Sequence, residues 1–148
     1  MGATIHGPGE GEVHELGPSR LELKAVSEDT DGKFFLSETT VGPGFPGPPP
    51  HIHEVLHDMF YVLDGTLSMR VGDEALELGP GTFVCVEPGT PHTFSNPGDE
   101  PVRFLNFNVP GGFELYMREL AAAMRERGGA IEPAEIGAIA ARYDFRPV

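Results

Sequence analysis

The stretch that decides the fold runs from Pro48 to Gly65 and reads PPPHIHEVLHDMFYVLDG. In an extended strand, residues two apart point to the same face, so His51 and His53 can present two imidazoles to one metal ion. Asp58 begins the next apolar strand and could add a carboxylate, which gives a two-His-one-acid set with open positions. This stretch therefore predicts β-structure with a metal site on it.

A second stretch with a histidine runs from Gly81 to Asn96 and reads GTFVCVEPGTPHTFSN. His92 begins a strand directly after a turn that contains Gly89. A barrel brings strands that are distant in sequence side by side, so His92 can lie beside the first two histidines.

Short strands separated by turn residues follow one another along most of the chain. We expect them near residues 20–26, 33–41, 51–55, 58–63, 66–71, 74–78, 82–86, 91–95 and 102–109. The tetrapeptide Leu63-Asp64-Gly65-Thr66 has the Asp-Gly signature of a two-residue hairpin. Many evenly spaced short strands indicate an antiparallel sandwich or barrel, so the predicted fold class is all-β.

The pattern changes at both ends of this region. Residues 1–19 show little periodicity and are predicted to form an N-terminal arm, which precedes the barrel at 20–110. Residues 111–148 form a predicted helical extension. In it, apolar residues recur at helical spacing from Phe113 to Met124, and a second short helix is expected over 133–143.

The composition excludes several classes of function. The 148 residues include 10 Lys and Arg against 23 Asp and Glu, a formal net charge of −13. This acidity argues against nucleic acid and anionic membranes, which bind through clustered cations. Cys85 is the single cysteine, so multi-thiolate zinc sites are excluded, and we expect its side chain to be buried. No apolar run has the length of a signal peptide or membrane span, so we expect a cytoplasmic protein.

The segment 44–96 resembles a cupin domain through two motifs. The first is a Gly, then His-x-His, an acidic residue and a Gly, represented by His51, His53, Asp58 and Gly65. The second is Gly-x5-Pro-x-Gly-x2-His-x3-Asn, represented by Gly81, Gly89, His92 and Asn96. The stretches PPPHIH, FYVLDG, PGTPH and PGGFE are similar to those of bacterial quercetin-dioxygenase-like cupins. The resemblance implies a single double-stranded β-helix, or jelly-roll, barrel.

The resemblance also implies a set of metal ligands. One divalent ion per chain, Fe, Mn, Ni, Co or Zn, would be held by His51, His53, Asp58 and His92. The sequence departs from the family at Asp58, where Glu is usual, and at Glu87, where the second motif has Pro. His57 could replace Asp58 if the strand began one residue earlier, because strand alternation lets only one of the two point inward. The spacing to Gly65 favours Asp58.

Four further residues are candidates for a substrate pocket. Phe60 and Val62 point to the same strand face as Asp58, and Phe94 points to the same face as His92. These side chains therefore either line a pocket or fill the barrel core. Asn106 lies on a polar strand face that is turned either to solvent or to the pocket.

The resemblance implies a metal-dependent dioxygenase that acts on a small aromatic or enolic molecule, with Asp58 as both ligand and catalytic base. One alternative is an isomerase, lyase or cyclase that uses the same metal as a Lewis acid. Another is a non-catalytic protein that binds a small molecule. Cupins commonly pair through sheet edges and N-terminal arms, so a homodimer is expected.

Overall fold

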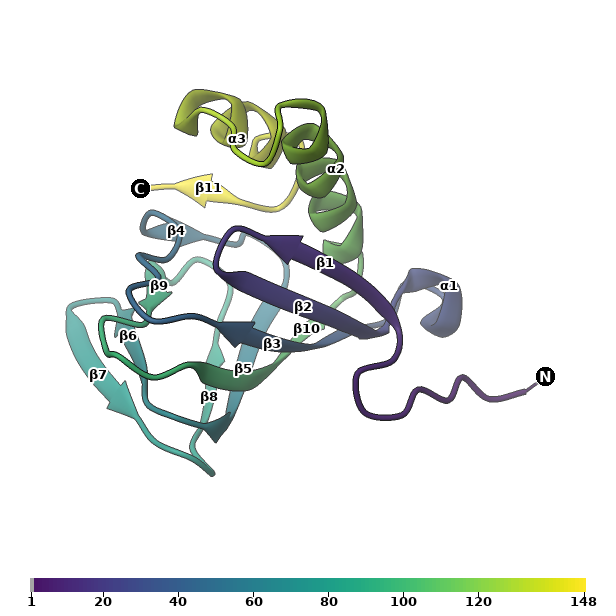
Figure 1. Cartoon of the computed structure of the whole chain (residues 1–148). Helices are drawn as coiled ribbons and strands as arrows, with labels where there is room; N and C mark the ends of the chain where they lie inside the picture. Colours follow the sequence, from purple (N-terminus) through teal and green to yellow (C-terminus); the bar gives the residue numbers. More distant parts are fainter. Residues whose placement is uncertain (1) are drawn as a thin grey trace.

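Two antiparallel sheets form the body of the molecule in the computed structural model, which describes residues 2–148 (Figure 1). The six-stranded sheet contains, in spatial order, β1 (Glu12–Leu16), β2 (Ser19–Ala25), β3 (Phe35–Val41), β10 (Val102–Val109), β5 (His57–Asp64) and β8 (Phe83–Val86). The five-stranded sheet contains β11 (Arg146–Pro147), β4 (His51–Ile52), β9 (His92–Ser95), β6 (Leu67–Val71) and β7 (Glu74–Leu78). The arrangement confirms the predicted all-β jelly-roll fold.

The interior of the barrel is filled by side chains that alternate along the strands. In β3 and β5 every second residue is buried, as expected for strands with one face on a core. We call the buried apolar cluster here the barrel core; it comprises Val41, Phe60, Val62, Leu67, Met69, Leu78, Val86, Val102 and Phe104. This core occupies the inside of the barrel away from the helices and supports the strands that carry the site.

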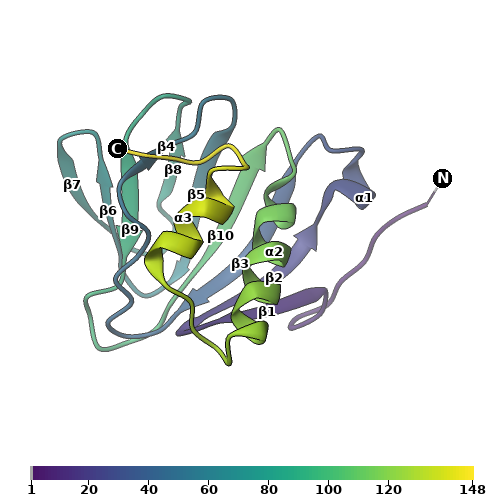
Figure 2. The same cartoon turned by 90° about the horizontal axis from the view of Figure 1, so that it is seen from above.

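The C-terminal residues form two helices, as predicted. Helix α2 (Phe113–Glu126) and helix α3 (Pro133–Ala140) lie over one end of the sheets, and β11 lies between α3 and β4 (Figures 1 and 2). The helical core is a second buried cluster, made of Leu21, Leu23, Phe35, Tyr116, Met117, Leu120, Ile139, Ala140 and Phe145. A short helix, α1 (Ser27–Thr30), and strand β11 were not predicted from the sequence.

The structure departs from the arm predicted over residues 1–19. Strand β1 lies within this segment and pairs with β2 in a hairpin whose last pair is Leu16 and Ser19. The sequence showed no alternation here because β1 has no fully buried residue: it lies at the sheet edge and is only half covered. His14, which we expected in a solvated arm, is therefore part of a strand.

The hairpin predicted at Asp64-Gly65 is wrong. Strand β5 pairs with β10 and β8, whereas β6 pairs with β7 and β9, so this turn carries the chain from one sheet to the other. Gly65 is needed there because its φ is 81° and a Cβ would lie 2.7 Å from the carbonyl oxygen of Pro101. A two-residue hairpin turn does join β6 to β7, at Gly72-Asp73.

The predicted burial of Cys85 is also wrong, because its side chain is exposed. Cys85 lies on the edge strand β8 and alternates with the buried Val86, so it faces outward. The strand predicted over 51–55 is shorter than expected, since β4 ends at Ile52.

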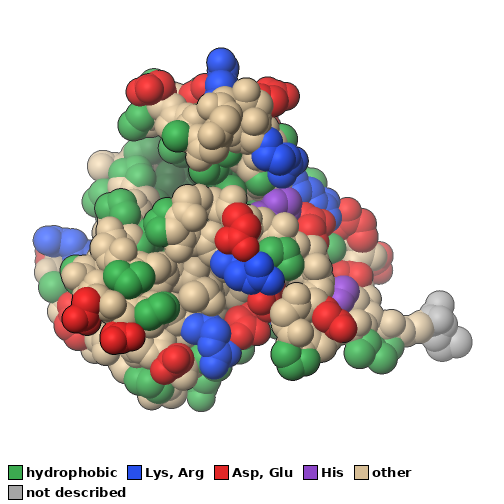
Figure 3. Space-filling view, in the orientation of Figure 1, with side chains coloured by type: hydrophobic (Ala, Val, Ile, Leu, Met, Phe, Trp, Pro, Cys, Tyr) green, Lys and Arg blue, Asp and Glu red, His purple; other side chains and the backbone are tan. Residues whose placement is uncertain are grey.

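The surface carries charges of both signs. On the face drawn in Figure 3, Lys and Arg side chains are interspersed with Asp and Glu and do not gather into one basic patch. Within residues 2–148, the longest helix falls short of the length and apolarity needed to traverse a bilayer.

Candidate metal centre

The fold brings together the four residues that the sequence motifs single out. His51 lies on β4, His53 lies one residue beyond it, Asp58 lies on β5 and His92 begins β9. His51 and His92 are directly paired across β4 and β9. Each of the four offers one nitrogen or oxygen atom, and these atoms all lie within 4.8 Å of one another. Each residue is at most 5% exposed.

The side chains converge on a common point from different strands. The ring centroid of His51 lies 4.4 Å from that of His92 and 4.9 Å from that of His53. Oδ2 of Asp58 lies 3.1 Å from Nε2 of His92 and 3.4 Å from Nε2 of His53. A carboxylate oxygen and imidazole nitrogens therefore face one another without an intervening side chain.

The imidazole tautomers are fixed by the backbone. Nδ1 of His51 donates to the carbonyl of Pro49 at 2.9 Å, and Nδ1 of His92 donates to that of Thr90 at 3.0 Å. Nδ1 of His53 donates to the carbonyl of Asp144 at 2.5 Å. A carbonyl can only accept, so each Nδ1 carries the proton and each neutral ring keeps its lone pair on Nε2. This is how metal-binding histidines are generally held.

The carboxylate of Asp58 is held by two asparagine amides. Nδ2 of Asn106 and Nδ2 of Asn108 both donate to Oδ1 of Asp58, each at 2.7 Å. Both asparagines lie on β10, where Asn108 is paired with Asp58 across the sheet. Because Oδ1 is taken up by these two donors, Oδ2 is the oxygen presented to the histidines.

The protonation of the cluster follows from burial and mutual charge. Burial lowers the pKa of His51 to about 4, and the charges of His92 and His53 act in the same direction. Burial would raise the pKa of Asp58, but hydrogen bonds to His53 and His92 outweigh it and hold this pKa below its usual range. Burial opposes protonation of His53 too, yet the hydrogen bond to Asp58 raises its pKa. Near neutral pH, Asp58 is ionised and His51 is neutral, the forms that bind metal ions. The raised pKa of His53 reflects a proton on Nε2 that bonds to Asp58, and an ion bound at this nitrogen would displace that proton.

The donor set fits one divalent first-row metal ion. Three imidazole nitrogens and one carboxylate oxygen are ligands that Zn, Fe, Mn, Co and Ni accept. Within residues 2–148, the buried Oδ1 of Asn108 has no hydrogen-bond partner, so a further oxygen acceptor lies beside Asp58. His51, His53, Asp58 and His92 are therefore the residues that would hold the ion, and the sequence prediction that they do so stays a prediction.

Comparison with known proteins places the chain in a family. The cupin domain family matches residues 37–108, which includes all four residues of the cluster. This chain is a small cupin. The cupin is 30% identical to quercetin 2,3-dioxygenase of Bacillus subtilis over 112 residues, which cover 76% of this chain and 33% of that protein. The chain spans between a third and a half of the length of the curated relatives it matches.

Solved structures give the same fold. The polyketide cyclase RemF from Streptomyces resistomycificus is 27% identical, with a TM-score of 0.62 over 74% of this chain and 80% of that one. The Streptomyces nucleoside dehydratase Pac13 is 16% identical, with a TM-score of 0.60 over 77% and 88% of the two chains. The latter likeness shows the fold alone.

The remaining sequence candidates fall into different environments. His57 is exposed on the outer face of β5, so strand alternation directs Asp58 and not His57 to the cluster. Phe60 and Val62 are fully buried in the barrel core, and Phe94 packs against it. The rings of Phe60 and Phe94 lie 5.4 Å apart. Asn106 faces inward and contacts Asp58, which settles the orientation that parity left open. That these four residues bound a substrate pocket stays a prediction.

Three further residues contact the cluster, and sequence reasoning missed two of them. Asn108 shares the inward parity of Asn106, and this alternation was a usable signal. Asp144 and Phe145 contact His53 and His51 from the end of the chain. No local pattern marks them, because the contacts join residues about ninety positions apart.

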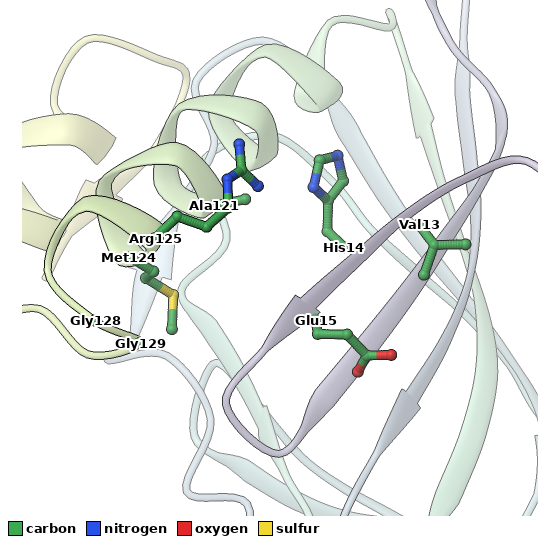
Figure 4. Close-up of a pocket in the computed structure, with 8 residues that line it drawn as sticks. All are labelled: Val13, His14, Glu15, Ala121, Met124, Arg125, Gly128 and Gly129. Atoms are coloured by element: carbon green, nitrogen blue, oxygen red, sulfur yellow. The ribbon is translucent and has the colours of Figure 1, made fainter.

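A groove outside the cluster lies between β1 and α2 and has a volume of about 460 Å³. It is lined by Val13, His14, Glu15, Ala121, Met124, Arg125, Gly128 and Gly129 (Figure 4). None of the four cluster residues lines it. His14 there is paired with Glu12 at 2.6 Å, so its imidazole is already bound within the protein.

The two amide donors to Asp58 lead to a first prediction. The double variant Asn106→Ala/Asn108→Ala is expected to bind Co²⁺ about 10–100-fold more weakly than the unaltered chain, because Asp58 loses both groups that orient it. Each single variant should lose less, since one donor remains. Dissociation constants from competition with a chromophoric chelator measure this, and unchanged affinity in the double variant would show that the amides do not orient Asp58.

Proposed function

We propose that this cupin is a metal-dependent oxygenase that acts on a small enolic or aromatic molecule. The observation that carries the proposal is the convergence of one ring nitrogen from each of the three histidines and one carboxylate oxygen of Asp58 within 4.8 Å. The identity of 30% with a quercetin 2,3-dioxygenase over 112 residues supports oxygenase chemistry within the family. When bound, a divalent ion would act as a Lewis acid that polarises an enol oxygen and lowers the pKa of its hydroxyl.

Asp58 would take the proton of that hydroxyl. Its Oδ1 is occupied by Asn106 and Asn108, so the proton acceptor would be Oδ2. A carboxylate that also binds a metal ion is a weak base, so Asp58 would accept a proton only from a hydroxyl that the ion has acidified. Proton transfer would therefore be confined to substrate bound at the site.

The protein surroundings would keep water from the reacting atoms. The four cluster residues are nearly inaccessible, and the aromatic rings of Phe60, Phe94 and Phe104 pack together in the adjoining interior, with centroids 5.4–5.7 Å apart. A dry, apolar surrounding strengthens the electrostatic interactions of the cluster and suits a weakly polar substrate.

Oxygen uptake is the test of this function. The chain is reconstituted separately with Fe²⁺, Mn²⁺, Co²⁺, Ni²⁺ and Zn²⁺ and mixed with flavonols and related enols in an oxygen electrode. We expect one of the reconstituted forms to consume oxygen together with an enolic substrate, and Asp58→Asn to lose at least about 100-fold in rate, within the range for removal of a general base. Absence of oxygen uptake with every metal and substrate would contradict oxygenase chemistry.

A second candidate function is a metal-dependent cyclase, isomerase or lyase. The identity of 27% with a polyketide cyclase favours it, since the same cluster could polarise a carbonyl without oxygen. Turnover under strictly anaerobic conditions would distinguish it from an oxygenase. The homodimer and the cytoplasmic location expected from the sequence stay predictions.

A further inference from the structure

The last five residues of the chain, the C-terminal tail 144–148, lie against the segment that carries His51 and His53. The carboxylate of Asp144 accepts hydrogen bonds from three successive backbone N–H groups, those of Glu54 at 2.6 Å, Val55 at 3.0 Å and Leu56 at 3.0 Å. These groups form the loop directly after His53. Asp144 thus fixes the path of the chain between the second histidine of the cluster and strand β5.

The backbone of Asp144 contacts the same histidine. Its carbonyl accepts the hydrogen bond from Nδ1 of His53 at 2.5 Å. The equivalent acceptors for His51 and His92 are Pro49 and Thr90, each only two residues away in sequence. His53 is therefore the one imidazole of the three whose Nδ1 acceptor lies in a distant part of the chain.

Phe145 contacts the first histidine. Its ring stacks on His51 with centroids 4.1 Å apart and an interplanar angle of 16°. It also meets the ring of His53 edge-on at 6.0 Å. On its other side Phe145 belongs to the helical core, where it stacks near Tyr116 at 6.1 Å. One side chain thus connects the packing of α2 and α3 to two imidazoles of the cluster.

The rest of the tail holds these two residues in place. Strand β11 pairs with β4 so that Arg146 is opposite Ile52 and Pro147 is opposite His51. The backbone N–H of Val148 donates to the carbonyl of Pro50 at 3.0 Å, and Arg146 lies 3.4 Å from a carboxylate oxygen of Glu54. The tail is thereby bound along the whole segment 50–56.

We propose that Asp144 and Phe145 are positioning residues of the metal site, and that binding of the metal ion and docking of the C-terminal tail stabilise each other. This inference rests on the proposed function in that it requires a metal ion at the cluster. Residues that orient metal ligands commonly contribute 10–100-fold to metal affinity. Coupling between two binding events is reciprocal, so a tail that orders the ligands is itself held more firmly when the ion is bound.

The test measures affinity for Co²⁺ alone, by competition with a chromophoric chelator. Asp144→Ala, which removes the acceptor for three N–H groups, is expected to weaken binding about 10–100-fold. Asp144→Asn keeps one side-chain oxygen acceptor and should restore part of the affinity. Phe145→Leu keeps an apolar residue in the helical core but removes the stacked ring, and should weaken binding about tenfold by the same reasoning.

Two matched variants control for general damage to the fold. Asp29→Ala removes a carboxylate that accepts the backbone N–H of Val26 far from the cluster. Phe113→Leu changes a ring that packs against Phe35 and Tyr116 in the helical core without contacting a cluster histidine. Both controls should bind Co²⁺ with the affinity of the unaltered chain.

A second readout needs no variant. Carboxypeptidase should digest the C-terminus of the unaltered chain about tenfold or more slowly when Co²⁺ is added. Because coupling is reciprocal, Co²⁺ should hold the tail in place by the same factor by which the docked tail raises the affinity for Co²⁺. Equal Co²⁺ affinity in Asp144→Ala, Phe145→Leu and the two controls, or digestion that Co²⁺ does not slow, would overturn this inference alone. An unaltered chain that binds no Co²⁺ would overturn the proposed function as well.

Discussion

Replacing His53 or His92 with alanine is expected to abolish retention of a divalent metal ion during purification. Each residue is at most 4% exposed and presents Nε2 to Oδ2 of Asp58, so each supplies one of four donors. Loss of a direct ligand should cost more than the roughly 100-fold that marks the upper end for an orienting residue. Metal content per chain, measured by elemental analysis after reconstitution and desalting, gives the result.

His57→Ala is the matched control for these variants. His57 lies in the same stretch of sequence, but its side chain is exposed on the opposite face of β5. Its removal should leave metal content unchanged. Metal retained by His53→Ala and His92→Ala, or lost by His57→Ala, would contradict the assignment of the four donors.

Replacing Gly47 with alanine is expected to destabilise the fold more than replacing any other glycine with alanine, because Gly47 has the shortest Cβ contact. A Cβ at Gly47 would lie 1.7 Å from the carbonyl oxygen of Phe94, and the residue has a φ of 78°. The left-handed backbone conformation costs about 1–2 kcal/mol for alanine and the steric clash about 1–3 kcal/mol, so we expect a loss of about 2–5 kcal/mol in the free energy of unfolding. Denaturant titration followed by circular dichroism measures it.

Gly44→Ala separates the two contributions. Gly44 lies in the same loop with a φ of 75°, but a Cβ there would meet nothing within 4 Å. This variant should lose only the cost of the left-handed conformation, about 1–2 kcal/mol. If Gly47→Ala were no less stable than Gly44→Ala, the proline-rich loop 42–50 would not pack closely on β9 at Gly47.

The site could be predicted from the sequence because its ligands are carried by local patterns. His51 and His53 share a strand face by simple alternation, and His92 follows a glycine turn that begins a strand. The choice of Asp58 over His57 needed only parity and spacing, and the structure turns Asp58 inward and His57 outward. Asn106 and Asn108 alternate with apolar residues on β10 and therefore share one strand face. The alternation alone does not show whether that face is turned to the interior.

What the sequence could not provide depends on the order of strands in space. Cys85 looks like a core residue within an apolar strand, yet β8 is an edge strand and this side chain faces outward. The turn at Asp64-Gly65 has hairpin residues, yet the chain crosses between sheets there. Asp144 and Phe145 reach the cluster only because α2 and α3 return the chain to β4, and no periodic pattern encodes a contact made by a two-residue strand.

The barrel and the C-terminal tail both contact the histidines of the cluster. Strands β4, β5 and β9 supply the donors, β10 orients the carboxylate, and the C-terminal tail orients the imidazoles of His53 and His51. The helical extension is therefore joined to the site through contacts with two of its four residues.

Anomalous diffraction at the metal absorption edge, from crystals of chain reconstituted with one divalent ion, tests whether these four residues hold the ion. We expect a single strong peak per chain, about 2.0–2.2 Å from Nε2 of each of the three histidines and from Oδ2 of Asp58. A peak located elsewhere, a peak that His57 ligates, or no peak at full loading would contradict this assignment.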